Sequence, residues 1–271
     1  MKSLVGLMLA LFIALPACSA ENGPATPPPG ADVATAPDPA PAVVENTETP
    51  PVVAQLDDPA VAQVEPSPDP APAAKPIAAP AERADIIAGK HYRVLNPTQP
   101  TSSSPDKIEV AEFFMYSCPH CMSFEPFIKE YVESKPAYVS FLRIPANFNS
   151  MARVHSKAFY MAETLGILED VHSDLFTEYH TKRNRLAEEK AVIDFFVAQG
   201  VTGDDAGTAF NSFAVDTKVR QADNLGRRYG IDSVPALVIN GKYVTSGSMT
   251  GSISKLREVV DYLTAKEAAE L

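Results

Sequence analysis

Beyond residue 84, the apolar positions of the chain follow first a strand pattern and then a helix pattern. Residues 108–116 are rich in β-branched and aromatic side chains, which predicts a buried central strand, and residues 138–144 have the same character. Between them, apolar residues recur at intervals of three and four, as in an amphipathic helix: Phe124, Phe127, Ile128, Tyr131 and Val132. Pro119 favours the start of that helix. We therefore expect a β-α-β unit.

The middle of the chain, about residues 149–213, shows no strand pattern and is expected to be helical. Its apolar residues have helical spacing in two groups, which are Met151, Val154, Ala158, Phe159, Met161, Ala162 and Leu165, and then Ala191, Val192, Phe195 and Phe196. Phe210 and Phe213 are expected to end a shorter helical segment. A further helix over residues 215–229 should stop at Gly230.

The C-terminal part returns to strands. Residues 236–239 are apolar, Lys242-Tyr243-Val244 follow, and Asn240-Gly241 between them is typical of a type I′ hairpin turn. Apolar residues over 253–263 then predict a last amphipathic helix. The expected order is β-α-β, a helical block, and β-β-α.

The first twenty residues have the features of an export signal. A positive charge at Lys2 precedes the apolar run 4–15, which is too short for a permanent spanning helix. Leu15-Pro16-Ala17-Cys18 resembles a bacterial lipobox, in which the cysteine becomes a lipidated N-terminus. Ordinary cleavage after residue 20 is the alternative. We favour lipidation of Cys18, because the sequence that follows suits a tether.

Residues 21–83 differ sharply in composition from the rest of the chain. Of the 25 prolines, 16 lie between residues 24 and 80, and residues 21–80 carry nine acidic side chains and one lysine. Such a segment has too little apolar area to offset the entropy lost on ordering. We expect a disordered, fairly stiff, acidic linker between the export signal and a domain at residues 84–268.

Charge and cysteine content exclude several classes of protein. The net charge of −11 disfavours nucleic-acid binding, which requires a basic face. Three cysteines in 271 residues exclude a disulfide-stapled mini-protein. Beyond the N-terminus, no apolar run is long enough for a multi-span membrane protein.

Cys118 and Cys121 lie where the predicted strand turns into the predicted helix. A Cys-x-x-Cys pair can be half of a metal site or a redox-active dithiol. Structural zinc usually takes four ligands, and the histidines of this chain show no paired ligand spacing. A redox pair needs only the two cysteines, and an exported protein meets an oxidising compartment. We therefore expect a redox-active disulfide, no metal and no other cofactor.

The helix start gives the two cysteines different roles. Unpaired backbone N–H groups and the helix dipole stabilise an anion at Cys118, whereas Cys121 is deeper. Cys118 should therefore have a lowered pKa and act as the nucleophile, while Cys121 resolves the mixed disulfide. His120 can add a donor or a positive charge to the Cys118 thiolate; a solvated loop residue is the alternative. A stabilised thiolate favours the reduced form, so Pro119-His120 indicates an acceptor of electrons.

Two further positions are candidates for the same site. Val234-Pro235 enters a strand, and a cis bond there would leave backbone groups free to pair with an extended substrate; a trans proline at a strand start is the alternative. Glu112 lies in the predicted buried strand, where an unpaired carboxylate is costly. It could accept the proton of Cys121 through water, or it could be a solvated residue at the strand edge.

These residues resemble the DsbA family of bacterial thiol:disulfide oxidoreductases over roughly residues 84–268. The similarity rests on Glu112-Phe113-Phe114 before Cys-Pro-His-Cys, and on Val-Pro-Ala at 234–236 before the Asn-Gly turn. It implies an α/β, thioredoxin-like fold, with a central mixed sheet flanked by helices and an inserted all-helical subdomain at about 149–213. It also implies that Cys118 attacks, that Cys121 resolves, that Pro235 is the cis-proline and that Glu112 is the buried acid. Arg143 is then the basic residue beside that acid.

The function expected from the residues and the resemblance is a periplasmic protein-disulfide oxidase, anchored to a membrane by lipid at Cys18. It would donate the Cys118–Cys121 disulfide to exported proteins that contain cysteines. A DsbB-type membrane quinone oxidoreductase would reoxidise it, by analogy with the family. The alternatives are a reductase or isomerase kept reduced, a metal carrier that uses Cys118, Cys121 and His120, and a non-catalytic lipoprotein stalk.

Overall fold

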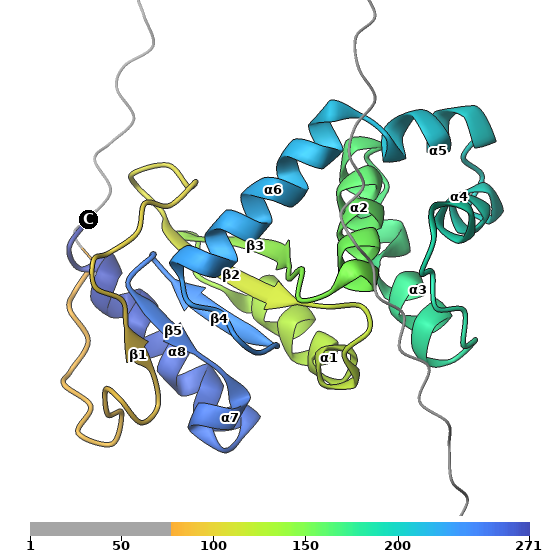
Figure 1. Ribbon diagram of the computed structural model, residues 1–271. Coiled ribbons are helices and arrows are strands. Elements are labelled where there is room, and N and C mark those ends of the chain that lie inside the picture. Colours follow the sequence, from red (N-terminus) through yellow and green to blue (C-terminus); the bar gives the residue numbers. More distant parts are fainter. Residues whose placement is uncertain (1–76) are drawn as a thin grey trace, which may run out of the picture. The chain divides into compact units, whose positions relative to one another are not determined.

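The computed structural model describes residues 77–271, and Figure 1 shows their arrangement. The export signal, Cys18 and the linker up to residue 76 lie outside the described residues. The expected fold class is confirmed: a five-stranded mixed sheet is flanked by helices, and further helices are inserted between its strands. Among residues 77–271, no helix has the length and apolar character needed to cross a membrane.

The sheet has the strand order β1-β5-β4-β2-β3. Its strands are β1 (Arg93–Val94), β2 (Ile108–Phe114), β3 (Val139–Pro145), β4 (Ala236–Ile239) and β5 (Tyr243–Thr245). The central strand β2 pairs with β3 in parallel and with β4 antiparallel. All seven residues of β2 are buried, as its apolar sequence predicts.

The two faces of the sheet pack against different helices. On one face, Ile108 and Val110 of β2 contact the apolar sides of α1 (Pro119–Ser134) and α8 (Ile253–Ala268). On the other face, Ala111 and Phe113 join a second core that includes α6 (Phe213–Arg228). This division follows from the alternation of side chains along a strand. Glu112 therefore points to the α1 side.

The helical insertion lies between β3 and β4. It contains α2 (Ser150–Thr164), α3 (Leu168–His180), α4 (Glu189–Ala198) and α5 (Gly203–Phe210), followed by α6. Phe210 and Phe213 do not share one short helix, which corrects the prediction. Phe210 ends α5, and Ser212 caps α6 by accepting a hydrogen bond from the Val215 N–H.

The hairpin between β4 and β5 has the predicted turn. Asn240 and Gly241 both have positive φ, at 49° and 60°, and the Lys242 N–H donates to the Ile239 carbonyl. Glycine is required at 241, because a Cβ there would lie 2.1 Å from the Gln99 carbonyl oxygen. The short helix α7 (Gly247–Thr250) leads from β5 to α8.

Candidate active site at the start of helix α1

Strand β2 ends at Phe114, two residues earlier than predicted, and a tight turn leads into α1. The Cys118 N–H donates to the Met115 carbonyl at 3.0 Å, which closes this turn. Cys118 is the N-cap residue of α1, and Pro119 is the first helical residue. Proline is favoured at this position because it has no N–H, and an N–H there would have no partner within the helix. The turn thus presents the Cys118 sulfur at the positive end of a 16-residue helix.

The two thiols are both free and have different environments. Cys118 is 8% exposed and Cys121 is fully buried one helical turn further on. The pKa of Cys118 is lowered to about 6, mainly because the Cys121 thiol donates a hydrogen bond to its sulfur. The backbone N–H groups of Cys121 and His120 and the charge of the exposed His120 add to this, against the effect of burial. The same pairing and burial raise the pKa of Cys121.

The segment before β4 approaches the same sulfur from a distant part of the sequence. The peptide bond between Val234 and Pro235 is cis. The Val234 carbonyl oxygen lies 3.7 Å from the Cys118 sulfur, although the two residues are 116 positions apart. Both Val234 and Pro235 are half-buried, so they form part of the wall beside the exposed edge of the thiol.

Glu112 lies beneath the cysteines and is fully buried. Its direct neighbour in the parallel register is Arg143 of β3, whose Nε lies 3.5 Å from Glu112 Oε2. Burial and the nearby negative charge of Glu125 raise the pKa of Glu112 to about 8, and Arg143 opposes this. The charge of Glu112 in turn contributes to the raised pKa of Cys121. The buried acid and the buried thiol are thus electrostatically linked.

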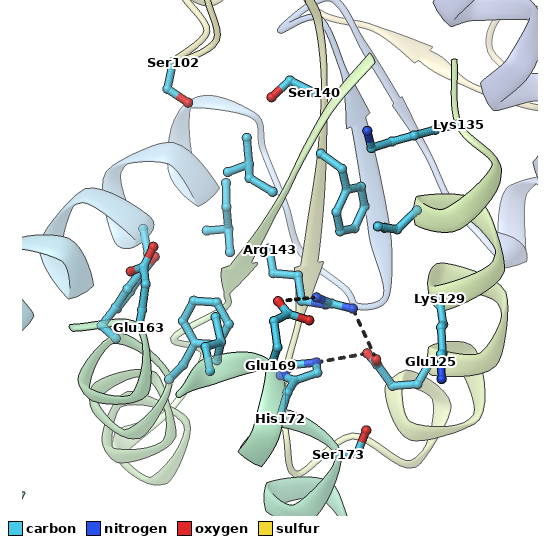
Figure 2. A pocket seen from close by; sticks show the side chains of 18 of the residues that line it. Ser102, Glu125, Lys129, Lys135, Ser140, Arg143, Glu163, Glu169, His172 and Ser173 are labelled. Carbon is cyan, nitrogen blue, oxygen red and sulfur yellow. Dashed lines mark ion pairs between the residues drawn. The ribbon is translucent and has the colours of Figure 1, made fainter. Parts of the chain in front are cut away.

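Arg143 connects Glu112 to a wider polar cluster, drawn in Figure 2. Its Nη2 lies 3.6 Å from Glu125 Oε2, and its Nη1 lies 3.8 Å from Glu169 Oε1. The other oxygen of Glu125 lies 3.4 Å from His172 Nε2. These side chains line one end of an open groove of about 1490 Å³ between α1, β3 and the inserted helices. The acid beneath the cysteines is therefore joined to the surface by charged groups.

Four further residues of this region were not predicted from the sequence: Tyr116, Glu125, His172 and His180. The Tyr116 hydroxyl lies 2.7 Å from His172 Nδ1, and His180 Nε2 donates to the Tyr116 carbonyl at 2.8 Å. The apolar spacing of Leu168, Val171 and Leu175 in α3 was the available signal. It predicts a helix, but it does not indicate which residues the two histidines contact.

No group of three His, Cys, Asp or Glu side chains within residues 77–271 is arranged to hold a metal ion. The described geometry brings together the Cys118–Cys121 pair and a buried acid. An acidic sulfur at a helix start, next to a thiol with a raised pKa, suits the formation and exchange of disulfides.

The chain is similar in sequence and structure to known thiol:disulfide interchange proteins. A family model described as a DSBA-like thioredoxin domain matches residues 138–256. The chain is 40% identical over 176 residues to the thiol:disulfide interchange protein DsbA of Burkholderia cepacia, covering 65% of this chain and 83% of that protein. It is 38% identical over 189 residues to DsbA of Pseudomonas aeruginosa, covering 70% and 89%. The crystal structure of Pseudomonas aeruginosa DsbA superposes with a TM-score of 0.66 at 38% identity, covering 69% of this chain and 96% of that one.

Proposed function

The chain belongs to the DsbA family of thiol:disulfide oxidoreductases, and on this basis we propose that it acts as a net oxidase of exported proteins through Cys118 and Cys121. The observation that carries the direction of the reaction is the acidity of Cys118. Its pKa falls from 9.0 to about 6 in the folded, reduced protein. By linkage, this stabilises the reduced state above pH 6, where Cys118 is a thiolate. A disulfide whose reduced form is stabilised is a strong oxidant.

The proposed reaction transfers two electrons from a client to the enzyme. A client thiolate attacks the Cys118 sulfur, the Cys118–Cys121 bond breaks, and Cys121 leaves as a thiolate. Glu112 is protonated at neutral pH and supplies the proton that Cys121 takes up. A second client thiolate then attacks the client sulfur of the mixed disulfide. This forms the client disulfide and releases Cys118 as a stabilised thiolate.

The remaining predicted site residues have supporting roles in this proposal. Pro119 fixes the start of α1, and its neighbour His120 contributes positive charge near the Cys118 thiolate. Val234 and Pro235 border the sulfur and would offer backbone groups to an extended client segment. A client bound there would present its thiolate along the open side of Cys118.

The proposed setting is the periplasm, where members of this family act on exported proteins that contain cysteines. The apolar run after Lys2 supports export. We propose that lipid at Cys18 anchors the protein to a membrane, with residues 21–83 as a spacer, and that a DsbB-type membrane quinone oxidoreductase restores the disulfide. Mass spectrometry of the mature N-terminus tests the anchor. A lipidated Cys18 supports it, whereas a free amine at Glu21 refutes it.

The direction of the reaction is tested by the thermal stability of the two redox states. We expect the reduced protein to unfold at a higher temperature than the oxidised protein at pH 7, because only the reduced form contains the stabilised thiolate. Thiolate absorbance against pH should give a midpoint near 6 that is lost in Cys118→Ser. An oxidised form that unfolds at the higher temperature would favour a reductase or isomerase. In that case the pair recovered from cells should be mostly reduced.

A further inference from the structure

His172 occupies a central position between the turn that carries Cys118 and the cluster around Glu112. It extends from α3 in the helical insertion and is 4% exposed. Its ring packs against Phe114, Phe159 and Phe176, and its two nitrogens face polar groups of two other segments. Nδ1 faces the Tyr116 hydroxyl at 2.7 Å, and Nε2 faces Glu125 Oε1 at 3.4 Å.

The Tyr116 hydroxyl determines which nitrogen of His172 carries a proton. Burial raises the pKa of Tyr116 well above its usual value, so the hydroxyl retains its proton. If the imidazole is neutral, Tyr116 donates to Nδ1 and the ring proton lies on Nε2. If the imidazole is charged, both nitrogens carry protons. In either state, Nε2 carries a proton and lies 3.4 Å from Glu125 Oε1, within ion-pair distance although the two atoms form no hydrogen bond.

Glu125 is thereby held between two partners. His172 faces one of its oxygens and Arg143 faces the other, and these are its two ion-pair partners among residues 77–271. Arg143 also forms an ion pair with Glu112 through its Nε, at 3.5 Å. The position of Glu125 therefore determines how one guanidinium is shared between an acid in the groove and the acid beneath Cys121.

The polar atoms of this cluster are under-bonded. In the described part of the chain, seven buried side-chain atoms lack a hydrogen-bond partner, and five of them belong to Glu112, Glu125, Arg143 and His172. Buried polar groups without partners are costly and rare. Their concentration next to a reactive pair indicates a functional arrangement rather than a stabilising one.

We propose that His172 is a positioning residue that holds Glu125 in place and so sets how far Arg143 is available to Glu112. The inference rests on the proposed role of Glu112 in moving the proton of Cys121. The charged and titratable groups around the ring are Glu125 of α1, Arg143 of β3, Glu169 of α3 and Tyr116, with Glu112 of β2 behind Arg143. On α2, His155 lies against the Tyr116 ring.

The loss of the imidazole has a defined consequence. Without Nε2–H, the carboxylate of Glu125 turns fully towards Arg143, which draws the guanidinium away from Glu112. Glu112 then loses part of its stabilising positive charge, and its pKa rises further. Removing the charge of Glu125 has the opposite effect, because that charge is one of the causes that raise the pKa of Glu112.

The step that reports on Glu112 is closure of the mixed disulfide in the oxidising direction. The reduced full-length protein is mixed with saturating oxidised glutathione, and Cys118 forms a mixed disulfide. Cys121 then passes its proton to Glu112, attacks the Cys118 sulfur and releases glutathione as a thiolate. The first-order closure rate is followed by acid quenching, alkylation and mass analysis. It should rise with pH through an inflection near 8 in the unmodified chain.

The variants shift this inflection in opposite directions. His172→Phe keeps an aromatic ring in the pocket and should raise the inflection by about half a pH unit, which slows closure at pH 7 about threefold. His172→Gln restores a donor towards Glu125 and should return the inflection towards its original value. Glu125→Gln should lower it, and His172→Phe should have no further effect in that background. His155→Phe is the matched control, since His155 is also buried but its Nε2 bonds the Arg185 carbonyl instead of facing Glu125.

The outcomes separate the two proposals. If Glu112→Gln leaves the inflection in place, the proposed role of Glu112 is wrong. If Glu112→Gln removes the inflection but His172→Phe leaves it unmoved and changes only stability, the positioning role is overturned while that of Glu112 stands. If His172→Phe does not fold, Tyr116→Phe is the second variant. It removes the hydroxyl that bonds His172 Nδ1, so the imidazole is no longer held in its orientation. An unmoved inflection in that variant also overturns the inference.

Discussion

A glutamate is buried near each end of strand β2, and the two side chains differ in their hydrogen bonding. At the start of the strand, Glu109 is 4% exposed and its Oε2 accepts hydrogen bonds from the backbone N–H and hydroxyl groups of Ser102 and Ser103. At the end, Glu112 is fully buried and neither oxygen has a hydrogen bond. The nearest ion-pair partner of Glu112 is Arg143 Nε, at 3.5 Å.

This difference separates a structural carboxylate from a reactive one. Because charge on a buried carboxylate is costly unless it is compensated, four donors at Glu109 both satisfy the side chain and hold the preceding loop against the sheet. At Glu112, which lies near Cys121, the free-energy cost of a buried charge is largely uncompensated because neither oxygen accepts a hydrogen bond. Proteins retain such local violations mainly at functional sites. Similar burial on one strand therefore serves two purposes, and hydrogen bonding distinguishes them.

The largest expected effect is on the pH dependence of stability. The pKa of Glu112 is raised from 4.5 to about 8, so the folded protein retains a proton that the unfolded chain releases. The stability from this group is fully present below pH 4.5 and is lost as pH rises through 8, at about 1.4 kcal/mol per pH unit and up to about 5 kcal/mol in all. The test is denaturant unfolding of the oxidised protein, in which no cysteine titrates, against Glu112→Gln.

The stability difference between Glu112→Gln and the unmodified chain should therefore widen steadily in favour of the variant from pH 5 to pH 8. Parallel curves would show that Glu112 is not the group that holds the extra proton. If Glu109→Gln removed the decline instead, the two ends of the strand would have the opposite roles.

Replacing each carboxylate by an apolar side chain should change the free energy of unfolding by a smaller amount. The two replacements should act in opposite directions. Glu109→Leu leaves the donors of Ser102 and Ser103 without their shared acceptor and should lower the free energy of unfolding at pH 7 by about 2 kcal/mol. Glu112→Leu removes an unbonded buried carboxyl group, while Arg143 keeps Glu125 and Glu169 as partners. It should raise the free energy of unfolding by about 1 to 3 kcal/mol. Equal losses in the two variants would remove the distinction between the sites.

Much of this region could be predicted from the sequence because its determinants are local. The strand, the helix start at Pro119 and the Asn240-Gly241 turn are set by residues close together in the chain. Glu112 was singled out because it precedes the cysteine motif by six positions in an apolar strand. Glu109 lies on the same strand, but it was not identified, because its hydrogen-bond partners are in an irregular loop whose path the sequence pattern does not indicate.

The rest of the cluster could not be predicted because it depends on how distant segments pack. His172 meets Tyr116 across 56 residues, and Arg143 reaches Glu112 through the strand register. Strand β1 has two residues, too few for a periodic signal. His180 ends α3 and donates to the Tyr116 carbonyl, 64 positions away in the chain. The contacts of His172 and His180 depend on how the helical insertion packs against the sheet, and that of Arg143 depends on the pairing of β2 with β3.

The smallest effect should come from the serines that bind Glu109. Ser102→Ala removes a hydroxyl that donates at 2.7 Å, but the backbone N–H groups of residues 102 and 103 still reach the same oxygen. Because Ser102 is exposed and water can replace its hydroxyl, we expect a loss of only about 0.5 to 1 kcal/mol in the free energy of unfolding. Closure of the mixed disulfide should keep its rate and its inflection, since Glu109 points to the face of the sheet away from Glu112. A change in the inflection without a change in stability would show that the two carboxylates communicate along the strand.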